Sequence, residues 1–252
     1  EIDGFIDITV TGGTNIYTYE WADGETSEDL SNLGIGIYSI TAIDQNGCTE
    51  TIDIEITEPT SLEITETHSN YNGYGVSCNG GNDGFIDITA VGGTGIFTYQ
   101  WGNGENTEDL NNIPIGYYNV VATDQNGCSI DLDLNITEPS EISILETISD
   151  YNGYGVSCNG SNDGFIDINV TGGYGLYSFE WSNGETSQNI SNIDAGFYNL
   201  NVTDENGCVE TIEIQITEPA DLEITEIHSN YNGYGVSCYQ EIDGFIDITV
   251  TG

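Results

Sequence analysis

The chain has 252 residues, of which 43 are Asp or Glu and none is Lys or Arg, so its formal net charge is −43. A field of this sign repels nucleic acids and anionic membrane surfaces, which argues against both as partners. Apolar residues make up an ordinary 37% and fall in regular patterns, which indicates folded domains with an acidic exterior rather than disorder. No apolar run approaches the roughly 20 residues of a membrane-spanning helix.

A long and fixed internal period organises the chain. The stretch Asp-Gly-Phe-Ile-Asp-Ile starts at Asp3 and returns at Asp83, Asp163 and Asp243. The octapeptide Tyr-Asn-Gly-Tyr-Gly-Val-Ser-Cys occurs unchanged at 71–78, 151–158 and 231–238, and residues 241–252 repeat residues 1–12. A fixed long period is typical of tandem arrays, so we expect this sequence to be a window on a longer one.

The period divides the chain into four repeats. We predict repeat 1 at 1–59 and repeat 4 at 220–252, both partial, with the complete repeat 2 at 60–139 and repeat 3 at 140–219.

Alternating apolar and polar residues predict short β-strands in each repeat. In repeat 2 the expected strands are, in order, 62–66, 83–90, 97–101, 116–124 and 130–136. The polar segment 107–112 is expected to form a short helical turn or an irregular crossing. Gly92-Gly93 and Asn103-Gly104 are turn signals, and Pro139 stops the last strand because it has no N–H to donate.

Short strands, frequent Gly and Asn turns and no helical periodicity predict an all-β fold. We expect tandem Ig-like antiparallel β-sandwich modules of about 80 residues, arranged as an extended filament. Tyr38, Tyr118 and Tyr198 each follow Gly-x, at the place where such sandwiches often carry a tyrosine corner.

The six cysteines alternate in spacing between 30 and 50 residues, which in an acidic repetitive chain indicates an oxidising, extracellular compartment. Two pairings are open. Cys78–Cys128 and Cys158–Cys208 would each close one repeat, with Cys48 and Cys238 bonded outside the window. Cys48–Cys78, Cys128–Cys158 and Cys208–Cys238 would instead tie each repeat to the next. We favour the first.

The chain resembles a known family in the succession Cys-Asn-Gly-x-x-Asp-Gly, Gly-Gly-x-x-x-Tyr/Phe-x-Tyr/Phe-x-Trp, Asn-Gly, Gly-x-Tyr and Asp-x-Asn-Gly-Cys. It is similar to the SprB repeat of very large surface adhesins in gliding Bacteroidetes such as Flavobacterium. Cys238-Tyr-Gln-Glu-Ile-Asp243 departs from the pattern. The resemblance implies a cell-surface filament that the type IX secretion system exports and the gliding machinery moves.

The tryptophans Trp21, Trp101 and Trp181 have two interpretations. They could stack on sugars at an adhesive surface, or pack between the two sheets of each sandwich. Their place in a strand of alternating aromatic residues favours the core.

Calcium is the one ion we weigh, since no other cofactor is predicted. The segment 79–87 partly matches an oxygen-ligand loop, but Ala90 stands where a calcium hand needs Glu. Carboxylates meeting between repeats, such as Glu138 with residues of the next repeat, are the alternative.

Other polar residues have simpler explanations. Asp44, Asp124 and Asp204 each precede a Gly-Cys turn, and a side chain capping its own turn is a commoner role than a metal ligand. His68 and His228 are replaced by Ile148 in repeat 3, so neither is an obligatory ligand or base.

These observations predict a non-catalytic stalk segment of a large surface adhesin. No nucleophile–base set or phosphate loop is present in the sequence. The expected partners are neighbouring repeats, the gliding or outer-membrane machinery, and external surfaces or polysaccharide. The alternatives are a glycan- or surface-binding Ig-like module and accessory repeats of a secreted enzyme.

Overall fold

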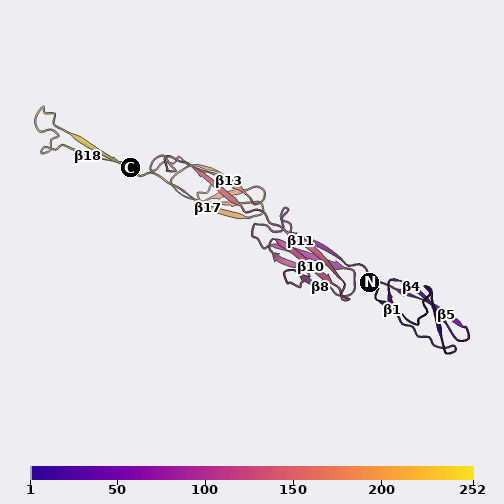
Figure 1. Ribbon diagram of the computed structural model, residues 1–252. Coiled ribbons are helices and arrows are strands. Elements are labelled where there is room, and N and C mark those ends of the chain that lie inside the picture. The colour runs from indigo at the N-terminus through magenta and orange to yellow at the C-terminus, as the bar shows by residue number, and fades with distance from the viewer. Residues whose placement is uncertain (1) are drawn as a thin grey trace. The chain divides into compact units, whose positions relative to one another are not determined.

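The computed structural model describes residues 2–252, and every regular element in that range is a β-strand (Figure 1). None of these residues forms a helix long and apolar enough to cross a membrane. The strands pair in antiparallel fashion, so the predicted all-β fold with antiparallel sheets is confirmed.

The strands recur with the sequence period. Repeat 1 contains β1 (Gly4–Ile6), β2 (Thr18–Trp21), β3 (Leu30–Leu33), β4 (Gly36–Ile43) and β5 (Thr49–Ile56). Repeat 2 contains β6 (Glu63–His68), β7 (Gly84–Val91), β8 (Thr98–Trp101), β9 (Leu110–Ile113), β10 (Gly116–Thr123) and β11 (Ser129–Ile136). Repeat 3 contains β12 (Ser143–Ile148), β13 (Gly164–Thr171), β14 (Ser178–Trp181), β15 (Ile190–Ile193), β16 (Gly196–Thr203) and β17 (Val209–Ile216). Repeat 4 contains β18 (Glu223–His228) and β19 (Ile246–Thr251).

Internal contacts divide the chain into two units. The first holds the chain up to Thr65 together with Thr89–Gln100 and Val121–Asp131. The second holds Glu66–Ile88, Trp101–Val120 and Leu132–Gly252. The repeat boundaries derived from the sequence stay predictions.

In the first unit, repeat 1 forms the sheets β1-β3 and β2-β4-β5. Its core is small. Ile6, Trp21 and Ile40 are buried, and partly buried Tyr38 and Ile54 pack against them.

In the second unit, repeat 3 shows the complete module. Its sheets have the strand orders β12-β13-β15 and β14-β16-β17, which recur in repeat 2 as β6-β7-β9 and β11-β10-β8. The long ladder of β16 with β17 pairs Gly196 with Ile216 at one end and Thr203 with Val209 at the other.

One apolar core joins the two sheets of repeat 3. It contains residues of both sheets, among them Ile166 and Ile168 of β13, Trp181 of β14, Leu200 of β16 and Ile216 of β17. Alternation explains this arrangement, since every second residue of a strand points to the same face. The module is therefore a sandwich of two sheets.

The structure differs from the prediction at residues 107–112. It does not make a helical turn: Leu110–Ile113 is strand β9, which pairs with the start of β7. The period-2 pattern fails because the register shifts at Gly84/Phe85 and Asn112 has a positive φ of 55°. Leu110 and Ile113 are consequently both buried although three positions apart.

The tryptophans lie in the core, as predicted. Trp21, Trp101 and Trp181 each expose 2% of their surface. Each indole N–H donates to the carbonyl six residues later, that of Ser27, Thr107 or Ser187, at 2.8, 2.9 and 2.9 Å. No indole face is therefore free to stack on a sugar.

The tyrosine corner is also confirmed. The hydroxyls of Tyr38, Tyr118 and Tyr198 donate to carbonyls four residues upstream, those of Gly34, Pro114 and Asp194, at 3.0, 2.9 and 3.0 Å. Burial raises the pKa of Tyr118, so its phenol stays a donor over the whole neutral range.

Adjacent tyrosines allow a controlled test of this corner. Tyr118→Phe removes the hydroxyl that bonds to Pro114, and we expect it to lower the free energy of unfolding by about 1 kcal/mol. Tyr117→Phe alters a side chain that is 89% exposed and should leave stability unchanged. Urea unfolding of both variants measures the difference; equal losses would show that the corner contributes nothing.

Candidate functional site: the junction between repeats

The segment that leaves repeat 2, residues 137–139, is bound by a loop of its own repeat. Residues 75–80 donate four hydrogen bonds to it. They run from Gly75 N and Val76 N to Thr137 O (2.8 and 3.1 Å), from Asn79 Nδ2 to Pro139 O (3.1 Å) and from Gly80 N to Glu138 Oε2 (2.7 Å). Repeat 3 binds 217–219 in the same way. Pro139 is fully buried.

Repeat 3 holds the residues that directly follow this segment, 140 and 141. The N–H of Gly173 donates to the carbonyl of Ser140 at 2.8 Å. Gly172 has a φ of +83°, and a Cβ there would lie 1.8 Å from the carbonyl oxygen of Glu141. Only glycine fits so close to the backbone. The residues on either side of the boundary between the repeats are therefore each held by hydrogen bonds of their own repeat.

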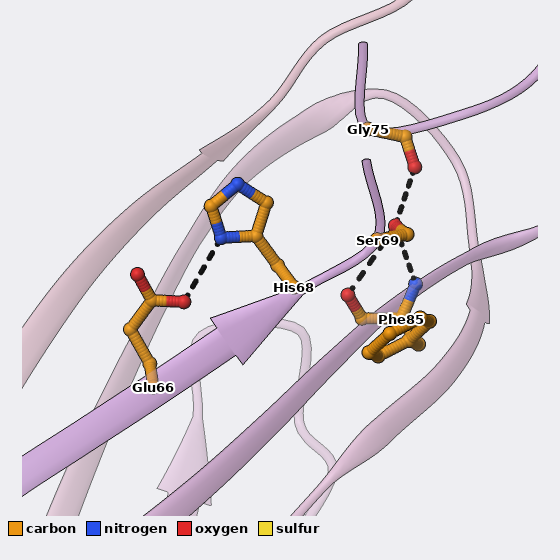
Figure 2. A network of polar contacts seen from close by, with 5 residues as sticks. All are labelled: Glu66, His68, Ser69, Gly75 and Phe85. Carbon is orange, nitrogen blue, oxygen red and sulfur yellow. Dashed lines mark hydrogen bonds and ion pairs between the residues drawn. The ribbon is translucent and has the colours of Figure 1, made fainter. Parts of the chain in front are cut away.

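A buried serine fixes the loop that makes these contacts. Figure 2 shows Ser69, whose hydroxyl donates to the carbonyl of Gly75 and accepts the N–H of Phe85 at 3.0 Å. Ser69 is 3% exposed and sits between β6 and this loop. His68 beside it makes only an exposed contact with Glu66, at 2.9 Å. The serine recurs as Ser149 and Ser229, a periodic signal that the sequence analysis did not use.

An aspartate shapes the turn that repeat 3 presents to repeat 2. Asp204 accepts the N–H groups of Asn206 and Cys208 at Oδ1, both at 2.9 Å, and that of Tyr174 at Oδ2, at 2.8 Å. Asp44 and Asp124 have the same turn contacts. The predicted role as turn caps is confirmed.

Polar and aromatic side chains connect the two repeats through this turn. Asn206 accepts a hydrogen bond from Asn72 at 2.7 Å and donates one to the carbonyl of Ser77 at 3.1 Å. The rings of Tyr74 and Tyr174 meet edge to face with centroids 6.4 Å apart.

A disulfide bond closes the same contact. Cys78 of repeat 2 bonds to Cys208 of repeat 3 across a sequence separation of 130, with their Cα atoms 5.6 Å apart. Cys48, Cys128, Cys158 and Cys238 are free and exposed. The favoured pairing of Cys78 with Cys128 and of Cys158 with Cys208 is therefore wrong, and so is the alternative pairing of nearest neighbours.

The physical reason is visible in repeat 3. Cys208 directly precedes β17, whereas Val156 and Asn159, on either side of Cys158, bond to Thr217 and Pro219 just after β17. Eight strand residues span roughly 26 Å. Disulfide bonding requires Cα atoms within about 7 Å, so the two cysteines of a repeat cannot meet.

A hydrogen bond of the same kind occurs at the start of repeat 2, within the first unit. Gly93 N donates to Thr60 O at 2.9 Å, as Gly173 does to Ser140. A hollow of about 530 Å³ there is lined by Asp3, Gly4, Pro59 and Cys128, among others. Its counterpart between repeats 2 and 3 is lined by Cys78, Pro139 and Cys208.

The calcium candidates have other partners. Glu138 accepts the Gly80 N–H, and Asp83 accepts the N–H of Ser77 at 3.0 Å. Between residues 2 and 252 there is no group of three or more His, Cys, Asp or Glu that could hold a metal ion.

The turn aspartate generates a pH prediction. Hydrogen bonds from the backbone of Thr14 and then of Cys48 lower the pKa of Asp44 to about 2. A depressed pKa means that the carboxylate stabilises the fold above the unfolded value of roughly 4, and that this contribution is lost as the pH falls through about 2. Asp44→Asn should therefore be less stable than the parent above pH 4, and the two should converge below pH 2.

Urea unfolding of both proteins across this range measures the effect. The difference between them isolates Asp44, because protonation of the other carboxylates relieves charge repulsion in both. A stability difference that stays constant from pH 7 to pH 2 would contradict the prediction.

The chain was compared with curated proteins, solved structures and family models. A comparison with curated proteins finds no match. Solved structures that match include the amphioxus IgVJ-C2 molecule, at 15% identity over 54% of this chain and 96% of that one, with a TM-score of 0.27. Another is the C-terminal 282-residue fragment of intimin in complex with the intimin-binding domain of the translocated intimin receptor, at 13% identity over 75% of this chain and 59% of that one, TM-score 0.31.

The family model of the SprB repeat matches residues 2–26, 76–106 and 156–186. The second and third segments begin two residues before Cys78 and Cys158 and extend beyond Trp101 and Trp181. They include the loop that binds the end of the repeat and the strand that carries the core tryptophan. Three segments of the chain therefore match the SprB repeat, in agreement with the resemblance in its sequence.

Proposed function

We propose that the chain is a tension-resisting stalk segment of a large cell-surface adhesin used for attachment and gliding. The observation that carries this proposal is the Cys78–Cys208 bond, which ties two successive repeats together across a connection that both repeats already hold. A protein whose role is only to fold each domain needs no such bond between domains.

The mechanism is physical. Separating repeats 2 and 3 must break the hydrogen bonds that Asn206 makes with Asn72 and with Ser77. Unfolding then meets the disulfide, which encloses 130 residues. In the chain-entropy model a loop of that length contributes about 5 kcal/mol to stability. A net charge of −43 opposes sideways association of such chains.

The chemistry of the disulfide and the match to the SprB repeat support the proposed location and export. Disulfides persist in oxidising compartments, which supports an extracellular position. The SprB repeat supports a place on the surface of a gliding bacterium, export by the type IX system, and coupling to motility machinery at the outer membrane. External surfaces or polysaccharide are the proposed contacts of the whole adhesin.

The structure argues against the alternative of a glycan-binding module that stacks sugars on its tryptophans. It would use Trp21, Trp101 and Trp181 as stacking platforms, and all three are buried and hydrogen-bonded. We propose a non-catalytic role for the same repeats.

Single-molecule pulling tests the stalk mechanism. With the bond intact, the chain between Cys78 and Cys208, a sequence separation of 130, cannot extend, so reduction should add about 450 Å to the length of the fully stretched chain. Cys208→Ser should show the longer extension without reductant, whereas Cys158→Ser should keep the shorter one. Equal extension of the oxidised and reduced parent would refute the mechanism.

Antibody labelling tests the cellular role. An antibody to repeat 3 should bind intact, unpermeabilised cells that make this protein, and bound fluorescent label should travel along the cell during gliding. Label seen only after permeabilisation would overturn the surface position. Surface label that never moves would leave the stalk mechanism standing and remove motility.

A further inference from the structure

We propose that the Cys78–Cys208 bond is one member of a regular series, in which the first cysteine of every repeat bonds to the second cysteine of the next repeat. In this series each of Cys48, Cys128, Cys158 and Cys238 forms one end of a separate bridge of the same kind. Their partner cysteines lie in further repeats of this kind in the same chain. The inference rests on the observed bond and the period, not on the proposed surface role.

The spacing of the cysteines supports the series. Cys78, Cys158 and Cys238 end the invariant octapeptide, and Cys48, Cys128 and Cys208 end the Asn-Gly-Cys turns. The observed bond joins one of each type at a separation of 130. Cys78 with Cys208 is the one pair of opposite type with that order and separation in the 252 residues. The four remaining cysteines are the four that are free.

The free cysteines have the surroundings of the bonded ones. The N–H groups of Cys48, Cys128 and Cys208 all donate to the aspartate four residues earlier, at 2.8, 2.8 and 2.9 Å. On the other side, Ser77, Ser157 and Ser237 all donate to the aspartate six residues later, at 3.0 Å. Each free thiol is therefore presented on a turn or loop already shaped for the bond.

Cys128 is placed against the preceding repeat. It lines the hollow between repeats 1 and 2 together with Asp3 and Gly4. These two residues correspond to Asp83 and Gly84, which follow Cys78 by five and six positions. Cys128 and the counterparts of the residues that follow Cys78 thus border one hollow, as Cys208 and Cys78 border another.

The longer repetition completes the pairing. Residues 241–252 repeat residues 1–12, so a second copy of the chain joined in register at that point continues the period without a break. Cys158 and the second copy's Cys48 then have the same sequence separation as the two cysteines of the observed bond. Cys238 and the second copy's Cys128 have that separation too. Every cysteine inside such an array has one partner.

Bridges of this kind overlap. The next bridge begins at Cys158, which lies 50 residues before Cys208, where the observed one ends. Every residue between the first and last bridge therefore lies inside a closed covalent loop. Each bond forms when two thiols lose two protons and two electrons, and a disulfide oxidant that accepts them is itself reduced to two thiols.

Peptide mapping of a tandem chain tests the proposal. The whole chain, followed directly by residues 13–252 of a second copy, is refolded with oxidised and reduced glutathione and its remaining thiols are alkylated. Cleavage at Asp and Glu is required because the chain has no Lys or Arg. We expect cross-linked peptides that join Cys158 to Cys48 and Cys238 to Cys128, besides Cys78 to Cys208. The single chain treated alike should give only the last pair.

A matched variant assigns the new bonds. Cys158→Ser in the first copy should abolish the Cys158–Cys48 peptide and leave that copy's Cys78–Cys208 bond intact. Absence of the Cys158–Cys48 and Cys238–Cys128 peptides from the parent tandem chain, or peptides joining Cys78 to Cys128 or Cys128 to Cys158, would overturn the series. The stalk mechanism would survive that outcome, because its pulling test depends on Cys78 and Cys208 alone.

Discussion

Strand β17 separates the two cysteines of repeat 3, and the covalent architecture depends on that separation. Cys208 directly precedes the first residue of β17. The loop that contains Cys158 lies just beyond the last residue of β17, where hydrogen bonds to Thr217 and Pro219 hold it. A sandwich with long strands thus places one thiol at each end. Each thiol can then react only with a neighbouring repeat, so a bond that would have stabilised one domain becomes a connection between two.

The contacts between repeats contain no Lys or Arg side chain. With no Lys or Arg, an acidic chain cannot join its domains through ion pairs, and its carboxylates must find neutral donors. Glu138 and Asp204 accept backbone N–H groups of their own repeats, and Asn72 and Asn206 bond amide to amide across the junction. Hydrogen bonds of this kind lack the long-range attraction that salt screens, whereas the repulsion between acidic surfaces is screened. The junction is therefore expected to tolerate high salt.

The sequence was sufficient for the fold and for single side chains whose role is local. Period-2 alternation located the long strands, the aromatic strand located Trp181, and turn chemistry located Asp204. The pattern failed at Leu110–Ile113, where a register shift and the positive φ of Asn112 break the alternation. The disulfide could not be predicted because spacing alone does not say at which end of a strand a loop is fixed. The bonds of Gly75 and Val76 to Thr137 decide that, and they join positions far apart in the sequence.

Burial of the tryptophans and bonding between repeats indicate two separate roles: the core stabilises each repeat, and the ends of the repeats connect them. The three tryptophans, which are the side chains best suited to stacking on a sugar, are buried in the core. The exterior is rich in carboxylates, and the ends of repeats 2 and 3 contact each other. Such a module is suited to holding other parts of a protein at a fixed reach. Because a disulfide limits extension even after the sheets come apart, the reach is set by covalent bonds while the weaker fold is free to yield and re-form.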